Sequence, residues 1–181
     1  MTSILKVSTL KDPTNSNTAL QIDTSGRVTM PNTVEIDLWR LTAAFSTNGV
    51  APTGWERSDN ATSAYAGTGM TESSGVFTFP STGLWKVTFV ALMQNDTSET
   101  SAGILGRVST DSGSSYTIIV SAYESQPSNA NLFWQTLVNV TNASTFRFSL
   151  LTSGFNTNTR VAGSSDRDNT SIMFERITDA Q

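Results

Sequence analysis

The chain has 181 residues, a formal net charge of −4 and only 14% charged residues, whereas 66 positions are Ser, Thr or Asn. It contains neither cysteine nor histidine, which excludes disulfides, cysteine–histidine zinc sites, iron–sulfur clusters, thiol nucleophiles and histidine-dependent catalytic triads. The eleven Lys and Arg residues are scattered, so neither a phosphate-binding surface nor a nucleic-acid partner is expected.

Residues 1–33 differ from the rest of the chain because short apolar pieces alternate with polar stretches. Such a segment can form small hairpins but cannot bury a core of its own. It is either a ragged terminus or an anchoring arm that orders against a partner, and its apolar pieces favour the arm. The residues expected to make the contacts are Ile4, Leu5, Val7, Leu10, Leu20, Ile22 and Val28.

No segment predicts a membrane partner. The first residues lack the apolar core of a signal peptide. The longest apolar stretch, residues 87–93, is too short to cross a bilayer.

From residue 34 onward the hydrophobic pattern has the period of β-strands. Apolar side chains alternate along residues 85–93, and residues 146–151 and 172–177 repeat the pattern. No window shows the 3.6-residue repeat of an amphipathic helix. The expected strands, bounded by turn-forming residues, are 34–46, 55–57, 76–80, 85–93, 102–110, 115–123, 132–141, 146–151 and 172–177.

Turn sequences separate these strands, notably Pro-Ser-Thr-Gly at 80–83 and Asp-Ser-Gly-Ser at 111–114. Residues 48–74 are expected to form a long loop that holds only the short strand 55–57. This spacing predicts an all-β fold over residues 34–181, an antiparallel two-sheet jelly-roll sandwich with almost no helix, preceded by residues 1–33 as an extended N-terminal arm. Its core is expected to contain Trp85, Phe89, Phe146 and Phe148.

The strand at 132–141 is apolar on both faces. Alternation places Trp134 on one face with Leu132, while Phe133 and Leu137 lie on the other. A strand of this kind should be covered on both sides. The second cover is either a neighbouring subunit or the loops of the same chain, so Phe133, Trp134 and Leu137 are candidate trimer or core residues.

Carboxylate pairs are the remaining option for acid–base chemistry. Glu35 and Asp37 share one strand face, where such a pair is expected to be solvated. Nothing in the pattern specifies the paired carboxylates of a glycosidase cleft. We therefore expect no catalytic residue and no enzyme activity.

Two acidic segments are candidates for metal or polar sites. Asp166, Asp168 and Asn169 could offer oxygens to Ca²⁺, but the ligand set is incomplete and Arg167 opposes it. A polar loop is the better interpretation there, and residues 56–60 are expected to form a hydrated loop. No metal and no cofactor is predicted.

Four aromatic residues fall in or beside predicted loops, where a sugar ring could stack. They are either candidate glycan contacts or plugs at the ends of the sandwich, and the second interpretation is favoured. They are Trp55, Tyr65, Tyr123 and Phe155.

Residues 75–87, Gly-Val-Phe-Thr-Phe-Pro-Ser-Thr-Gly-Leu-Trp-Lys-Val, place an aromatic pair, a proline, a turn glycine and another aromatic before a long apolar strand. With Ala-Ala-Phe-Ser at 43–46 and Asn-Thr-Ser-Ile-Met-Phe-Glu-Arg-Ile at 169–177, this resembles the tumour-necrosis-factor/complement-globular-head jelly rolls over residues 34–178. The resemblance implies a compact homotrimer that binds or scaffolds rather than catalyses.

The N-terminal stretches Leu-Lys-Val-Ser-Thr-Leu-Lys-Asp at 5–12 and Leu-Gln-Ile-Asp-Thr-Ser-Gly-Arg-Val-Thr at 20–29 are similar to leaders of tailed-phage virion proteins. Together the two resemblances imply a homotrimeric capsid decoration (cement) or head-fibre protein on the virion surface, whose arm binds the major capsid protein or another virion protein. The alternative is the receptor-binding tip of a tail fibre that recognises a host surface glycan.

Overall fold

The computed structural model describes residues 9–11, 18–22, 24–26, 28–29, 34–60, 65–94, 101–125 and 129–181. The chain divides into two compact units, residues 1–33 (the arm) and residues 34–181 (the head). Within the described residues every regular element is a strand, and there is no helix that could span a membrane.

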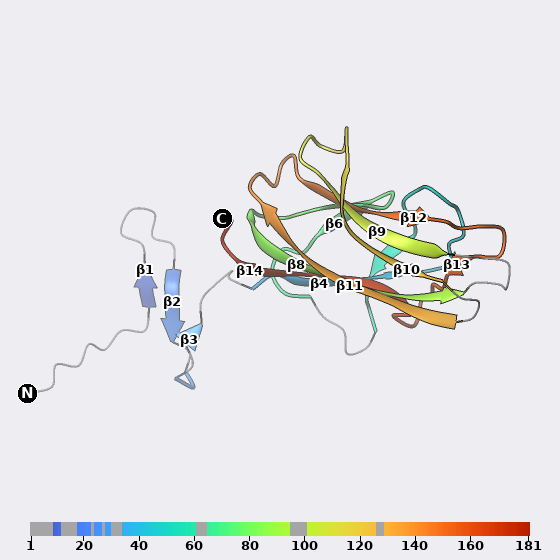
Figure 1. Ribbon diagram of the computed structural model, residues 1–181. Helices are drawn as coiled ribbons and strands as arrows, with labels where there is room; N and C mark the ends of the chain where they lie inside the picture. The colour runs from blue at the N-terminus through green and yellow to red at the C-terminus, as the bar shows by residue number, and fades with distance from the viewer. Residues whose placement is uncertain are drawn as a thin grey trace, which may run out of the picture. The chain divides into compact units, whose positions relative to one another are not determined.

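The arm is a small antiparallel sheet in the order β1-β2-β3 (Figure 1). Its strands are β1 (Thr9–Lys11), β2 (Thr18–Ile22) and β3 (Val28–Thr29). Gly26 has a φ of 78° in the turn between β2 and β3, a conformation that glycine adopts without steric cost. Position 10 pairs with position 20 across the first hairpin, and Ile22 pairs with Val28 across the second.

The head is built from two antiparallel sheets, which form two layers in Figure 1. The six-stranded sheet contains, in spatial order, β11 (Asn129–Val140), β8 (Gly83–Gln94), β14 (Thr170–Thr178), β4 (Ile36–Leu41) and β5 (Trp55–Arg57), with β13 (Arg160–Val161) paired to β8. The five-stranded sheet contains, in spatial order, β10 (Thr117–Glu124), β9 (Ala102–Ser109), β12 (Arg147–Ser153), β7 (Val76–Thr78) and β6 (Thr71–Ser73). The predicted all-β jelly roll is therefore confirmed.

Period-two patterning determines which side chains fill the space between the sheets. Every second residue of β8 from Trp85 to Met93 is buried, and the intervening residues face outward. Aromatic rings from both sheets meet in this core, including Phe77 and Phe174 with centroids 5.0 Å apart. The four aromatic residues predicted for the core are all buried, namely Trp85, Phe89, Phe146 and Phe148.

Most predicted strands shift by one to three residues at their ends, and the larger differences are at β4, β6 and β13. Strand β4 covers only Ile36–Leu41, because the chain then leaves the sheet and Phe45 forms an isolated bridge with Val161. Strands β6 and β13 have three and two residues, too few to produce a readable period. The strand predicted at 55–57 is present as β5.

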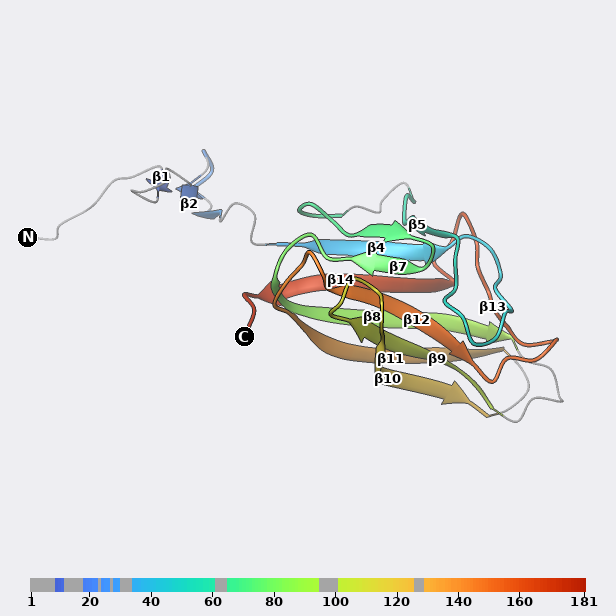
Figure 2. The ribbon, with the colours of Figure 1, turned by 90° about the horizontal axis from the view of Figure 1, so that it is seen from above.

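The first and last strands of the head lie side by side. Strand β14 is inserted between β4 and β8, so that Ser171 pairs with Arg40 on one side and with Val90 on the other. The beginning of β4 and the C-terminus lie at the same end of the sandwich (Figure 2), where Gln181 exchanges two hydrogen bonds with Asn139.

Candidate functional site

Strand β11 forms one edge of the six-stranded sheet and carries the largest exposed apolar side chains of that sheet. Leu132, Trp134 and Val138 point into the core and are buried, whereas Phe133 is 57% exposed and Leu137 is 59% exposed. The alternation predicted for this strand is confirmed. The described loops of the same chain do not cover Phe133 and Leu137, which leaves them free to contact a partner.

Strand β10 forms the corresponding edge of the five-stranded sheet, and the two edge strands run along the same side of the sandwich (Figure 2). Its exposed apolar residues are Ile118, Ile119 and Tyr123. We call these three residues together with Phe133 and Leu137 the edge patch. Sequence reasoning overlooked Ile118 and Ile119, although a run of Ile-Ile-Val cannot place all its side chains on one face of a strand.

The outer face of the six-stranded sheet, on which Phe133 and Leu137 of the edge patch lie, is partly apolar and holds one ion pair. In register with Leu137 lie Lys86 and Glu175, whose charged groups are 2.6 Å apart. In register with Phe133 lies Val90, which is also exposed. A shallow hollow of about 370 Å³ is lined by Lys86, Gln135, Thr136 and Leu137. This sheet face can therefore receive apolar side chains around a central charge pair.

The carboxylates of Glu35 and Asp37, expected to be solvated, are instead buried. Asp37 is 1% exposed and accepts two hydrogen bonds from the Arg57 guanidinium, at 2.8 and 3.0 Å. The hydrogen bond to Asp37 raises the pKa of Arg57 despite partial burial. Backbone N–H groups of Thr68 and Gly69 donate to Glu35, and that of Met70 donates to Asp37. Both carboxylates thus hold the 66–70 loop in place.

Arg40 organises the segment that was predicted to be a hydrated loop. Its guanidinium is buried and donates to Glu56 at 2.7 Å, to Asp59, and to Asn60 at 3.0 Å. Burial opposes its charge, but the hydrogen bonds and charges of Glu56 and Asp59 outweigh burial and raise the pKa of Arg40. Residues 56–60 are thereby held against the sheet by charge-assisted contacts.

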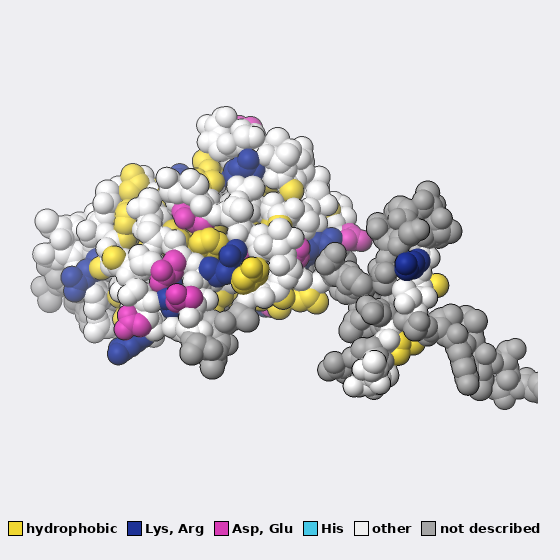
Figure 3. Space-filling view, turned by 180° about the vertical axis from the view of Figure 1, so that it is seen from behind, with side chains coloured by type: hydrophobic (Ala, Val, Ile, Leu, Met, Phe, Trp, Pro, Cys, Tyr) yellow, Lys and Arg dark blue, Asp and Glu magenta, His cyan; other side chains and the backbone are white. Residues whose placement is uncertain are grey.

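The acidic residues considered for Ca²⁺ belong to the same neighbourhood. Asp168 lies 4.0 Å from Arg40 and accepts hydrogen bonds from the Ser58 hydroxyl at 3.0 and 3.2 Å. Asp166 accepts a hydrogen bond from Ser164. Among the described residues, no group of three acidic side chains is placed to hold a metal ion. In the view of Figure 3, acidic and basic side chains of the head lie close together among uncharged groups.

Two of the four aromatic residues are buried, as the favoured interpretation expects, and are not glycan contacts. Trp55 is buried in β5 with its indole N–H donating to the Pro52 carbonyl at 2.8 Å, and Phe155 is buried in the loop after β12. Both fill the sandwich instead of facing solvent.

Tyr65 and Tyr123, the other two, are half exposed but lie at opposite edges of the head. The Tyr65 ring stacks over the Arg57 guanidinium, 4.2 Å from ring centroid to Cζ. The Tyr123 ring lies flat over Gly103, where an added Cβ would be 2.6 Å from Cδ1, and its hydroxyl is 3.4 Å from Ser153 Oγ. They cannot belong to one binding site.

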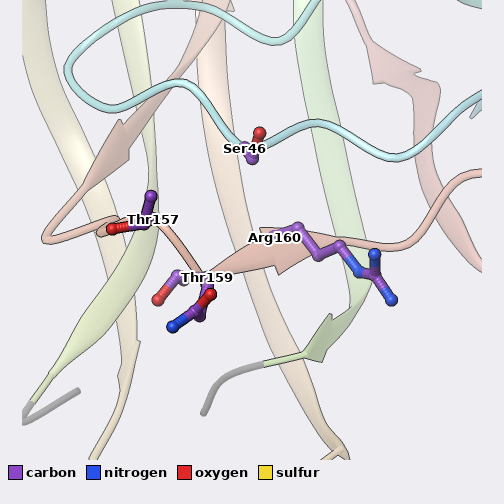
Figure 4. A pocket seen from close by; sticks show the side chains of 5 residues that line it. Ser46, Thr157, Thr159 and Arg160 are labelled. Atoms are coloured by element: carbon purple, nitrogen blue, oxygen red, sulfur yellow. The ribbon is translucent and has the colours of Figure 1, made fainter. Parts of the chain in front are cut away.

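A polar hollow of about 440 Å³ lies at the end of the head opposite Gln181. It is lined by Ser46, Thr157, Asn158, Thr159 and Arg160 (Figure 4). The guanidinium of Arg160 donates to Gln94 Oε1 at 2.7 Å and extends away from Thr157. The hydroxyl groups and the guanidinium that line the hollow therefore do not converge on one point.

Of the seven predicted arm contacts, Ile4, Leu5 and Val7 lie outside the described residues. Leu20 lies in β2 at the position that pairs with Leu10. The side chains of Leu10, Ile22 and Val28 are exposed. These are available to a partner, as an anchoring arm requires.

No family model and no curated protein matches the sequence. Among solved structures, murine APRIL at pH 5.0 aligns with a TM-score of 0.61 and 10% identity, over 80% of this chain and 100% of that chain. Eiger TNF from S. frugiperda aligns with a TM-score of 0.60 and 11% identity, over 82% and 95%. At these identities the likeness shows the fold, and it confirms the jelly roll of tumour-necrosis-factor type predicted from residues 43–46, 75–87 and 169–177.

Proposed function

We propose that this chain is a non-enzymatic structural protein of a phage virion, a homotrimeric capsid decoration (cement) or head-fibre protein. The head forms the trimer, and the arm attaches it to the major capsid protein or another virion protein on the shell. The observation that carries the proposal is the exposed edge patch on a jelly roll of this type.

The edge patch is suited to contact between copies of the chain. Phe133 and Leu137 are exposed on one face of β11, and a group of exposed large apolar side chains often marks a surface that a partner covers. The outer face of the six-stranded sheet, on which Phe133 and Leu137 lie, also carries the exposed Val90 and the Lys86–Glu175 pair. Contact of this face with a different surface of the next copy would be heterologous, and such a contact closes into a ring when the rotation is right. A three-membered ring accords with the trimer that the family resemblance implies.

The virion assignment is supported by the arm. Its sequence is similar to phage virion leaders, and β1 and β3 are the edge strands of its small sheet. Unpaired backbone groups on an edge strand can add to a sheet edge of another protein, whatever the side chains are. This mode of attachment fits an arm rich in Ser, Thr and Asn.

Sedimentation equilibrium of the purified protein tests the trimer. We expect the mass of three 19.4 kDa chains for the wild type and a monomer for Leu137→Glu, because the charge would be buried in the interface. The matched control is Val50→Glu, an exposed apolar residue outside the edge patch, which should remain trimeric. A wild-type monomer, or a trimer unaffected by Leu137→Glu, would contradict the proposed interface.

Immunogold electron microscopy of virions tests the location. Label over the whole shell is the expected result, and deletion of residues 2–30 should abolish attachment while the head remains a folded trimer. Label confined to the tail, or attachment of the deleted protein, would refute decoration through the arm.

The second candidate function is the receptor-binding tip of a tail fibre, and the half exposure of Tyr65 and Tyr123 favours it. The purified protein should then bind host cells and compete with infection, and Tyr65→Ala or Tyr123→Ala should weaken binding. If the purified protein does not bind host cells even at concentrations comparable to those at which phage adsorption is saturated, this function is refuted.

A further inference from the structure

The arm has one apolar face, which its strand register defines. Position 10 pairs with position 20, Ile22 pairs with Val28, and positions 20 and 22 are two apart on the same strand. Residues two apart on a strand, and residues paired across strands, lie on the same face. Leu10, Ile22 and Val28 therefore occupy one face, and their side chains are 53%, 41% and 63% exposed.

A three-stranded sheet of this size needs a cover for such a face. Its strands have three, five and two residues, and a sheet this short is not stable in water unless its apolar face is packed. The cover must therefore be another surface that is present whenever the arm is ordered.

We propose that this cover is the same face of the arms of the other copies, so that the three arms of one trimer pack together through their apolar faces. The inference rests on the trimer of the proposed function. Three identical arms tethered to one trimeric head are held at an effective concentration on the order of millimolar, well above that of any free partner.

The charges of the arm permit this convergence. Residues 1–33 contain three basic and two acidic side chains, so three copies carry no large charge of one sign that would drive them apart. The apolar face is then directed toward the sister arms, while the edges of β1 and β3 stay free for the shell. The arm sheet thus makes two different contacts. Its side chains contact the sister arms of the trimer, and the backbone of its edge strands contacts the virion.

Cross-linking of single-cysteine variants of the full chain tests the proposal, since the wild type has no cysteine. Leu10→Cys places a thiol on the apolar face, and Thr9→Cys places one on the opposite face of the same strand. A short bismaleimide that spans the ~10 Å between packed sheets should link Leu10→Cys chains into dimers, with at most about two thirds of the chains paired in a trimer. The yield should be unchanged on 100-fold dilution, and Thr9→Cys should give at least tenfold less dimer.

Val28→Cys provides a second probe on the apolar face and should behave like Leu10→Cys. Sedimentation of each variant separates the two hypotheses. A monomeric head would overturn the proposed trimer, whereas a trimer in which neither Leu10→Cys nor Val28→Cys cross-links better than Thr9→Cys would overturn only the convergence of the arms. Cross-linking that appears only on virions would also overturn it, because the shell would then supply the cover.

Discussion

Replacing Phe148 by alanine tests how the core holds the two sheets together. The ring is fully buried, 6.2 Å from Trp134 and 5.8 Å from Phe174 between centroids. The neighbouring strand β9 packs tightly against the ring, because a Cβ added at Gly106 would lie 3.1 Å from Phe148 Cζ. The site cannot collapse around the missing ring, so the substitution should cost about 3–5 kcal/mol of the free energy of unfolding.

Urea denaturation followed by tryptophan fluorescence measures this loss. With an m-value of about 1–3 kcal/mol per M urea, the midpoint should fall by at least ~1 M. The matched control is Phe133→Ala, the same chemical change at an exposed position, which should cost about 1 kcal/mol or less in the monomer. In the trimer its effect should instead depend on protein concentration. A loss below ~1 kcal/mol for Phe148→Ala would mean that the strand faces are misassigned.

Three further substitutions probe the polar contacts of the head. Arg40→Ala leaves the acidic groups around it unpaired, so it should lower the melting temperature more than Arg167→Ala, which removes an exposed arginine; equal losses would contradict the burial of Arg40. Hydrogen bonds from Ser109 and Ser115 lower the pKa of Asp111 to about 2. The stability that the Asp111 carboxylate gives the turn is therefore complete above the ordinary aspartate pKa near 4, and it is lost as the pH falls through about 2. Amide exchange in this turn should show that loss in the wild type and not in Asp111→Asn. Gly69→Ala should destabilise the head by about 1–3 kcal/mol in thermal unfolding, because φ is +75° and the new Cβ would lie 2.9 Å from Asp37 Oδ2; an unchanged melting temperature would refute this.

The strands of the head could be predicted because their information is local. Alternation in 85–93 and 132–141 records which side of the strand faces the core, and the structure places Phe89 and Trp134 inside and Phe133 outside accordingly. The exposed residues of β11 were also predicted, since apolar character on both faces of one strand requires a second cover.

The buried charges could not be predicted, because their partners are distant in the sequence. Asp37 is paired with a guanidinium 20 residues away and with a backbone amide 33 residues away. Arg40 gathers acceptors from residues 56–60 and lies near Asp168. A carboxylate or guanidinium gives the same local signal whether it is solvated or enclosed, so only the assembled fold distinguishes the two.

The insertion of β14 between β4 and β8 has a consequence for synthesis. A ribosome releases residues 170–178 after every other strand of the head, yet the strand that they form pairs with both the first strand of the head and the long strand β8. Until these residues have been synthesised, the six-stranded sheet has a gap at its centre, and folding must wait for contacts that span almost the whole head. A chain that terminates before residue 170 lacks the central strand and cannot close the sandwich. The topology therefore restricts assembly to chains that include residues 170–178, because only these can present a finished sheet face to another copy.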